Sequence, residues 1–238
     1  MSQESNCLDE KTLERAATYP IKPASLELDG QLVKIRPLHS ADLVATEQLA
    51  HHLYDMSSGK ALGGYYGDDE YDADALIWRH MLSGPYSSYE DFAKSRIIEM
   101  EIERNFVVYH AQTDIPIGMV ALMNHSSKDL RVEIGNTWYV PAAQGTGANR
   151  ETVYLLLRHL FEVLGYRRVE WRCNNLNFRS RKAALTLGFT MEAVLRQVMI
   201  CKGLSRDDNV LAMLDGEWPQ VKQMLEHQIQ ATIDAVNN

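Results

Sequence analysis

Cysteine is scarce in this sequence of 238 residues, which has only Cys7, Cys173 and Cys201. An odd number of widely spaced cysteines argues against a disulfide framework and against a zinc site with the usual ligand spacing. Long hydrophobic runs are also lacking, since there is no apolar stretch of about 18 residues and no basic-then-apolar leader. We therefore expect a cytoplasmic protein with no membrane partner.

Positive charge is in the minority, because 24 Lys and Arg residues face 32 Asp and Glu residues and the formal charge is −8. A negative field opposes general nucleic-acid binding and favours cationic small molecules. The eight histidines lack the spacing of metal ligands, so we expect no metal. Hydrophobic residues make up 45% of the chain, which is ordinary for a globular protein and sufficient for a core.

Hydrophobic periodicity predicts a mixed order of strands and helices. Alternating or short apolar runs predict strands at residues 31–36, 106–111, 116–124, 132–140, 168–173, 189–198 and 209–214. Helical spacing predicts helices at residues 40–54, 73–81, 88–103, 149–164, 179–187 and 218–236. This order predicts an α/β (α+β) fold, in which helices flank a mixed sheet.

The domain organisation follows from where the periodicity begins. Residues 1–27 are polar and weakly periodic, so we assign them to an N-terminal extension. Residues 28–238 are predicted to form a single domain, which is an ordinary length for one. Residues 56–105 are predicted to be an insertion in it, made of a long Gly-, Ser-, Tyr- and Asp-rich loop and two short helices.

The most informative stretch is the loop at residues 141–150, which contains Gly145 and Gly147 and precedes a predicted helix. The first N–H groups of a helix have no internal partners, and the helix dipole adds positive potential there. The two glycines lack the Cβ atoms that would keep a phosphate from the backbone. The loop therefore predicts a phosphate-bearing ligand, although similar turns also join strands to helices without one.

Two nucleotide-binding patterns are excluded by the end of this loop. A Walker loop ends in Gly-Lys-Ser/Thr, whereas this one ends in Ala148, Asn149 and Arg150. The dinucleotide fingerprint needs a third glycine at the position of Arg150.

Several ordered motifs resemble those of the GCN5-related N-acetyltransferases (GNAT). Residues 144–149, Gln-Gly-Thr-Gly-Ala-Asn, resemble the family's pyrophosphate loop, and residues 177–180 with a later Gly-Phe pair resemble its second signature. Residues 132–135 and a late Trp-Pro pair resemble the branch close to the ribosomal-protein N-terminal acetyltransferases (RimJ/RimL-like). The resemblance covers roughly residues 31–222.

The resemblance implies a GNAT-like fold, with a mostly antiparallel central sheet, two splayed parallel strands and flanking helices. It implies acetyl-coenzyme A as co-substrate, with the pyrophosphate on the loop and the pantetheine arm paired like an extra strand between the splayed strands. Backbone groups of Tyr139 and Val140 would bind the arm, and an N–H near Val140 would polarise the thioester carbonyl. The residues implied in cofactor binding are Tyr139, Val140, Gln144, Gly145, Thr146, Gly147, Ala148, Asn149, Arg150, Asn177 and Ser180.

One departure from the family affects the leaving group. Many members place a tyrosine four residues before the Gly-Phe pair, as general acid for the departing thiolate, and this chain has Ala184 there. Ser180 is the nearest substitute, because its hydroxyl can donate a hydrogen bond to the thiolate sulfur. Its structural alternative is a place in the first helical turn after the N-cap Asn177.

The attacking amine must lose a proton, which a carboxylate can accept. The resemblance favours Glu133 as this base, on the strand face that alternation assigns also to Tyr139, with Glu170 second. Tyr86, in a Gly-Pro-Tyr turn, and Glu170 are predicted to contact the substrate. The structural alternatives are ion-paired strand carboxylates for the two glutamates and a turn anchor for Tyr86.

We therefore expect an acyltransferase that moves an acetyl group to the primary amine of a small molecule, by direct attack in a ternary complex. The first alternative is a protein N-terminal acetyltransferase, which needs an open groove in place of a closed pocket under residues 56–105. The second is a catalytically weak coenzyme A-binding module, because Ala184 supplies no phenol. The resemblance is compatible with a monomer or a homodimer.

Overall fold

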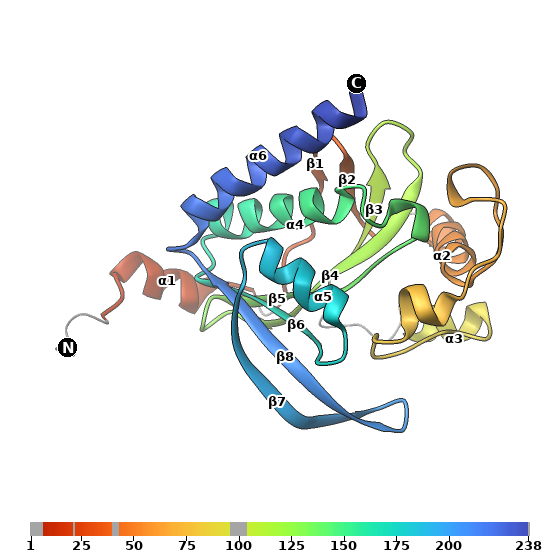
Figure 1. The fold of residues 1–238 in the computed structure, drawn as a ribbon. Helices are drawn as coiled ribbons and strands as arrows, with labels where there is room; N and C mark the ends of the chain where they lie inside the picture. Colours follow the sequence, from red (N-terminus) through yellow and green to blue (C-terminus); the bar gives the residue numbers. More distant parts are fainter. Residues whose placement is uncertain (1–6, 21, 40–42, 96–103, 238) are drawn as a thin grey trace.

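One eight-stranded sheet, in the order β1-β2-β3-β4-β5-β6-β8-β7, runs through the molecule (Figure 1). The computed structural model describes residues 7–20, 22–39, 43–95 and 104–237. The strands are Leu28–Asp29 (β1), Val33–Pro37 (β2), Arg104–His110 (β3), Pro116–Ser126 (β4), Arg131–Tyr139 (β5), Arg168–Asn174 (β6), Thr190–Cys201 (β7) and Leu204–Leu214 (β8). The helices are Glu10–Thr18 (α1), Leu43–Ser57 (α2), Tyr89–Ala93 (α3), Ala148–Arg158 (α4), Phe178–Thr186 (α5) and Trp218–Asn237 (α6).

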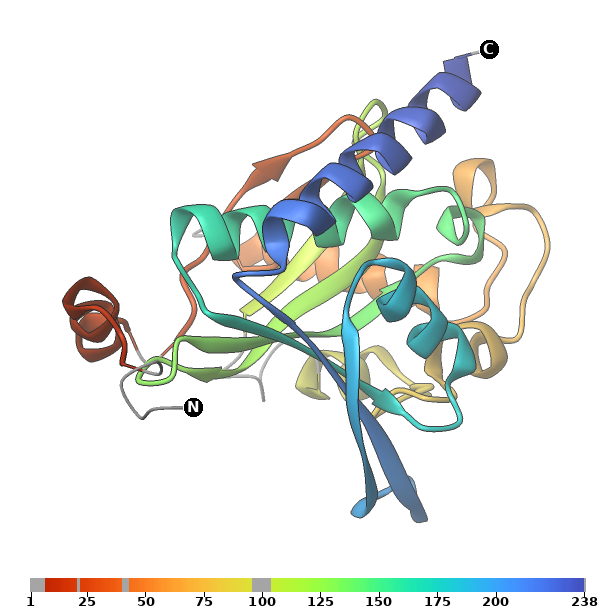
Figure 2. The same ribbon diagram turned by 60° about the vertical axis from the view of Figure 1, so that its left-hand side comes forward.

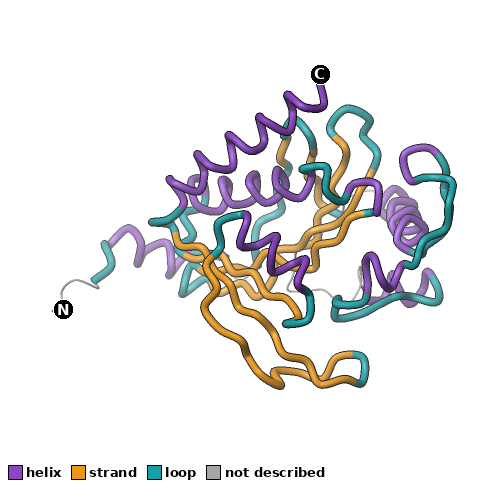
Figure 3. The backbone as a smooth tube through the Cα atoms, viewed as in Figure 1, coloured by secondary structure: helices purple, strands orange, loops and turns teal. Residues whose placement is uncertain are grey.

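Helices cover both faces of the sheet, as the apolar stripes predict. Helices α4 and α6 lie side by side on one face (Figure 2), where the Tyr154 hydroxyl donates to Glu226 at 2.7 Å. Residues 43–95 cover part of the other face, and the Trp78 ring packs there with its centroid 5.7 Å from that of Trp138. Strands β7 and β8 form a long hairpin that extends beyond the body of the molecule (Figure 3).

The predicted fold class is confirmed, because only β5 and β6 are parallel among the described neighbouring strands. Helix α1 and strand β1 were not predicted: α1 is polar on average, with Thr12 as its only buried residue, and β1 has only two residues. The helix predicted at residues 73–81 is a single π-helical turn over Asp74–Trp78. The helix predicted at residues 88–103 begins as α3, and residues 96–103 lie outside the described residues.

A β-bulge in β5 overturns one sequence-based argument. The register places Met123 beside Glu133 and Met119 beside Trp138, so these four residues lie on one face of the sheet. Between them the bulge, where Asn136 has a φ of 49°, inserts an extra residue and reverses the alternation. Tyr139 therefore lies on the face opposite to Glu133, whereas simple alternation assigned both to one face.

None of the helices in the described part of the chain is long and apolar enough to cross a membrane.

Candidate functional site

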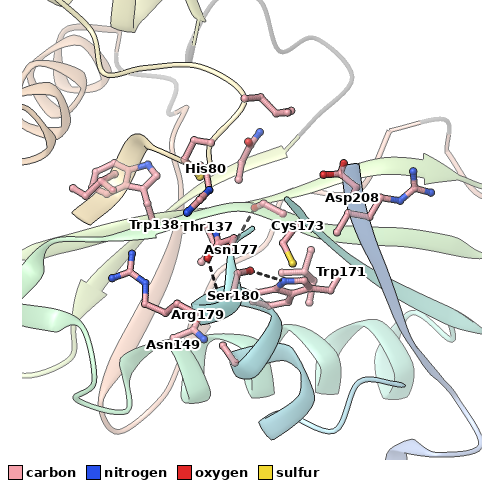
Figure 4. Close-up of a pocket in the computed structure, with 18 of the residues that line it drawn as sticks. His80, Thr137, Trp138, Asn149, Trp171, Cys173, Asn177, Arg179, Ser180 and Asp208 are labelled. Atoms are coloured by element: carbon pink, nitrogen blue, oxygen red, sulfur yellow. Dashed lines mark hydrogen bonds between the residues drawn. The ribbon is translucent and has the colours of Figure 1, made fainter. Parts of the chain in front are cut away.

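A cavity of about 350 Å³ lies where β5 and β6 separate. Their parallel pairing runs from Arg131 and Arg168 to Glu133 and Glu170 and stops there, although both strands continue. The walls come from both strands, the 143–149 loop, α5, the inserted residues 76–82 and the β7–β8 hairpin (Figure 4). Of the predicted site residues, those that line the cavity are Glu133, Tyr139, Gln144, Gly145, Asn149, Asn177 and Ser180.

The cavity passes from one face of the sheet to the other through the gap between the strands. Trp171 and Cys173 face the side of α5, whereas Arg172 lies on the face shared with Glu133. The register of β6 with β8 adds Asp208 to the Glu133 face. A ligand in the gap can thus contact two chemically different regions, one on each side of the sheet.

The two loop glycines have different roles. Gly145 has a φ of 80°, and a Cβ placed there would meet no atom within 4 Å, so its backbone is open to the cavity. A Cβ on Gly147 would instead meet Thr232 of α6 at 2.9 Å and Leu32 at 3.3 Å, so this glycine permits close packing of the loop and not of a ligand. Beside Gly145 there is thus open space, whereas the space beside Gly147 is filled by Thr232 and Leu32.

Other loop residues face away from the cavity. The Arg150 guanidinium donates to Thr232 Oγ1 at 3.0 Å, and Thr146 Oγ1 donates to the Ala143 carbonyl at 2.8 Å. Val140, Thr146, Gly147, Ala148 and Arg150 are not part of the cavity wall. The Ala148 N–H donates to Thr146 Oγ1 at 3.4 Å, and because the N-cap Gly147 has no side chain, the next N–H groups of the first turn of α4 have no side-chain cap.

The backbone of β5 shows which N–H near Val140 can face a ligand. The Val140 N–H donates to the Ile117 carbonyl of β4 at 3.0 Å, so it points away from the gap. Consecutive residues of an antiparallel ladder alternate in direction, and the Tyr139 N–H and carbonyl therefore face the gap. The Tyr139 carbonyl already accepts from Gln144 Nε2 at 2.9 Å, and Gln144 Oε1 accepts from Arg179 at 2.9 Å.

The Ser180 hydroxyl is oriented by its neighbours. Asn177 caps α5 by accepting the Ser180 N–H at 3.0 Å, as the capping alternative predicts. The indole Nε1 of the buried Trp171 donates to Ser180 Oγ at 3.0 Å, which uses an acceptor site of the hydroxyl, and the hydroxyl also forms a hydrogen bond with the Cys173 side chain. Burial raises the pKa of the adjacent Cys173 thiol, so this cysteine is a poor nucleophile.

The two predicted carboxylates have contrasting environments. Glu133 is 4% exposed and accepts from Asn124 at 2.8 Å, and burial raises its pKa despite that bond and Arg172 at 3.5 Å. Burial also opposes ionisation of Glu170, but hydrogen bonds from Arg168 at 2.8 Å and Arg172 at 3.0 Å hold its pKa below the ordinary value. Glu170 is not part of the cavity wall.

Tyr86 is not at the cavity either. Its hydroxyl shares hydrogen bonds with Ser83 at 2.6 Å and Ser95 at 2.9 Å, and its ring packs edge-on against Trp78. The structure thus supports the alternative role of Tyr86 as an anchor within the insertion.

Three cavity residues have no local sequence signal, namely His80, Arg206 and Asp208. Arg206 and Asp208 form a buried ion pair of 2.7 Å on β8, and only the strand register brings them to the site. Burial and then the neighbouring arginines lower the pKa of His80, which favours its neutral form. Among the described residues, no cluster of His, Cys, Asp and Glu side chains is suited to a metal ion.

The insertion and the hairpin close over one end of the cavity. The Lys202 ammonium donates to the Trp78 carbonyl at 2.7 Å, and Arg206 donates to the His80 carbonyl at 3.0 Å. Cys201 Sγ lies 3.5 Å from the Leu82 carbonyl. These contacts end the π-helical turn and join two segments about 120 residues apart in the sequence.

The comparisons with known proteins identify acetyltransferases of similar sequence and fold. The family profile described as an acetyltransferase (GNAT) domain matches residues 34–190. A probable N-acetyltransferase, YjcK of Bacillus subtilis, is 24% identical over 79% of this chain and 97% of its own length. A GCN5-related N-acetyltransferase from Brucella melitensis has a TM-score of 0.75 with 28% identity over 87% of each chain. A probable GNAT-family acetyltransferase from Chromobacterium violaceum has a TM-score of 0.68 with 30% identity over 83% of this chain and 90% of its own.

Proposed function

Because this chain belongs to the GNAT acetyltransferase family, we propose that it transfers the acetyl group of acetyl-coenzyme A to the primary amine of a small molecule, by direct attack in a ternary complex. The observation that carries the proposal is the cavity between β5 and β6, which connects Ser180 on one face of the sheet with Glu133 on the other. We also propose that the chain belongs to the RimJ/RimL-like branch of the family, because residues 132–135 resemble that branch.

The residues around the gap fit the co-substrate, which supplies an activated acyl group. The open backbone at Gly145 and the first-turn N–H groups of α4 suit its pyrophosphate. The backbone edge at Tyr139 suits its amide-containing arm, and Asn177 retains its side-chain NH₂ as a donor after capping α5.

Each step has a residue placed to assist it. Glu133 takes the proton of the amine, and its raised pKa makes it a stronger base than an ordinary glutamate. The Tyr139 N–H, next to Val140, donates to the oxygen that becomes negative as nitrogen attacks the thioester carbonyl. As the C–S bond breaks, the Ser180 hydroxyl donates a hydrogen bond to the thiolate sulfur.

The contacts of the hairpin with the insertion favour a small acceptor over a protein N-terminus. Lys202 and Arg206 bind the carbonyls of Trp78 and His80, so the acceptor end of the cavity is roofed on the side where an open groove would need to run. The alternative function, a coenzyme A-binding module, predicts the same cofactor site but no transfer of the acetyl group to an amine.

Calorimetric titration with acetyl-coenzyme A tests the cofactor site. Wild type is compared with Gly145→Asp and with the matched neutral variant Gly145→Asn, because both residues tolerate a positive φ and only one adds a negative charge. We expect micromolar binding by wild type, about tenfold or greater weakening by Gly145→Asp, and a smaller effect of Gly145→Asn. Gly147→Glu is a poorer probe, since it would disturb the contact with α6.

No binding by folded wild-type protein would contradict the proposal. Binding without release of free thiol in the presence of any amine would leave only the coenzyme A-binding module. Equal weakening by the two Gly145 variants would show that the loop does not sense the charge of the ligand.

A further inference from the structure

The part of the cavity on the Glu133 face is lined mainly by apolar side chains. They come from three directions: Met81 and Leu82 from the insertion, Met123 from β4, and Val198 and Met199 from β7. Methionine side chains are flexible and polarizable, so they can adapt to ligands of different shapes. This wall is suited to an apolar part of a ligand rather than to a ligand segment that has several charged groups.

The acidic side chains in this part of the cavity already have positively charged neighbours. Glu133 and Asp208 are the acidic residues among those lining the cavity. Asp208 is paired with Arg206 at 2.7 Å, and both side chains are less than a tenth exposed. Arg172 adds a further positive charge between Glu133 and Glu170. A second ammonium group bound beyond Glu133 would therefore meet no uncommitted carboxylate.

The negative charge of the chain as a whole is located elsewhere. The acidic run at residues 68–74 contributes no residue to the cavity wall, and Asp74 is paired with Arg79 at 3.1 Å. The net charge of −8 therefore attracts cations to the molecule without creating a polycation site in the cavity.

From these contacts we infer that the acceptor is a monoamine whose amino group is carried on an uncharged apolar body, and that polyamines are poor acceptors. The inference rests on the proposed function for the position of the amine at Glu133. Its apolar body extends towards Met81, Leu82 and Met199, where it removes apolar surface from water. A polyamine would lose hydration of its second ammonium against the same wall without gaining an ion pair.

Calorimetric binding of 2-phenylethylamine and spermidine, with and without saturating coenzyme A, tests the inference without requiring catalysis. We expect wild type to bind 2-phenylethylamine at least about tenfold more tightly than spermidine. Leu82→Glu places a carboxylate on the cavity rim, where the leucine is 43% exposed, and we expect the fold to accept a polar side chain there. It should tighten spermidine binding about tenfold, whereas the neutral Leu82→Gln should not.

Wild-type preference for spermidine, or no binding of either amine, would overturn the inference. Equal effects of Leu82→Glu and Leu82→Gln would also do so, because the added charge would then have no partner in the ligand. Thiol release from acetyl-coenzyme A is measured separately with both amines. Its absence beside a clear binding preference contradicts the proposed function and leaves the pocket inference standing.

Discussion

Glu133 and Glu170 are neighbours on the paired ends of β5 and β6, but they compete for one arginine. Arg172 lies 3.0 Å from Glu170 and 3.5 Å from Glu133. Glu170 is bound in addition by Arg168 and Arg131, so it is held as an anion, whereas Glu133 has one neutral donor, Asn124. The two glutamates therefore differ in basicity although each is 4% exposed to solvent.

Substitution of either glutamate tests this difference through the pH dependence of kcat/KM. We expect an acidic limb set by Glu133 above the ordinary glutamate pKa, because the base must be ionised to act. Glu170→Gln should move this limb to lower pH, since it frees Arg172 for Glu133 and removes a nearby negative charge. Glu133→Gln should abolish the limb and lower kcat/KM about 10²- to 10⁴-fold.

Stability provides the control for Glu133→Gln. A buried carboxyl whose folded-state pKa is raised ionises more readily in the unfolded chain, so it lowers stability increasingly as the pH rises from the unfolded pKa to the folded pKa. The variant should therefore withstand at least as much urea as wild type at pH 8. A large loss of stability, or an unchanged acidic limb, would show that Glu133 is a structural group and not the base.

The sequence placed residues at the cavity where their position depends on local chain geometry, and their roles in binding and catalysis stay predictions. Asn177, Ser180 and Gly145 lie next to a helix start, and a motif of a few residues specifies such positions. Tyr86 and Glu170, predicted to contact the substrate, do not line the cavity, because packing inside the insertion and ion pairs across strands decide where those side chains point. Asp208 gave no signal, since the register of β6 with β8 alone brings it to the site.

At the scale of elements, Glu151 connects helix α4 to the edge of the sheet. It is 4% exposed, and its carboxylate accepts the backbone N–H groups of Gln31, Leu32 and Val33 at 2.9, 2.6 and 2.8 Å. The same helix start provides the N–H groups proposed for the cofactor. The carboxylate therefore fixes the first turn of α4 relative to β2.

Replacing this carboxylate should destabilise the fold. Glu151→Gln replaces one acceptor oxygen by an NH₂ group that faces backbone donors, and we expect a cost of about 3 kcal/mol in the free energy of unfolding. Urea denaturation measures the effect. Glu47→Gln, on the exposed surface of α2, is the matched control and should change stability by less than about 0.5 kcal/mol. Similar midpoints for the two variants would rule out a structural role for the three hydrogen bonds.

The order of elements was largely predictable, because most strands and helices have a clear apolar period. The ends were less predictable where an element leaves the core. Strand β8 begins at Leu204, five residues before its predicted start, since residues 204–208 belong to the projecting hairpin and include few apolar side chains. The π-helical turns at residues 74–78 and 159–163 also have no distinct sequence signal.

At the scale of the whole molecule, the hairpin and the insertion act together as one wall. Lys202→Met removes the hydrogen bond to the Trp78 carbonyl and should let the two segments separate. We expect KM for the amine to rise about tenfold, by the loss of one charged hydrogen bond, with little change in acetyl-coenzyme A affinity. Lys222→Met on α6, whose lysine pairs with Glu162, is the control. Equal kinetic effects of the two variants would contradict a role of the Lys202 contact in acceptor binding.

The separation of β5 and β6 has a consequence for the chain in a crowded solution. An unpaired strand edge is normally a template for aggregation, because any extended polypeptide can add to it. Here the free edge at Tyr139 faces inwards, between two strands that are joined at one end and covered by α5 at the other. Because α5 and the 143–149 loop border this edge, a second protein strand has less access to it than to an open sheet edge. The molecule thus keeps an unpaired strand edge that a ligand in the cavity can reach, while the surrounding elements shield it from other polypeptide chains.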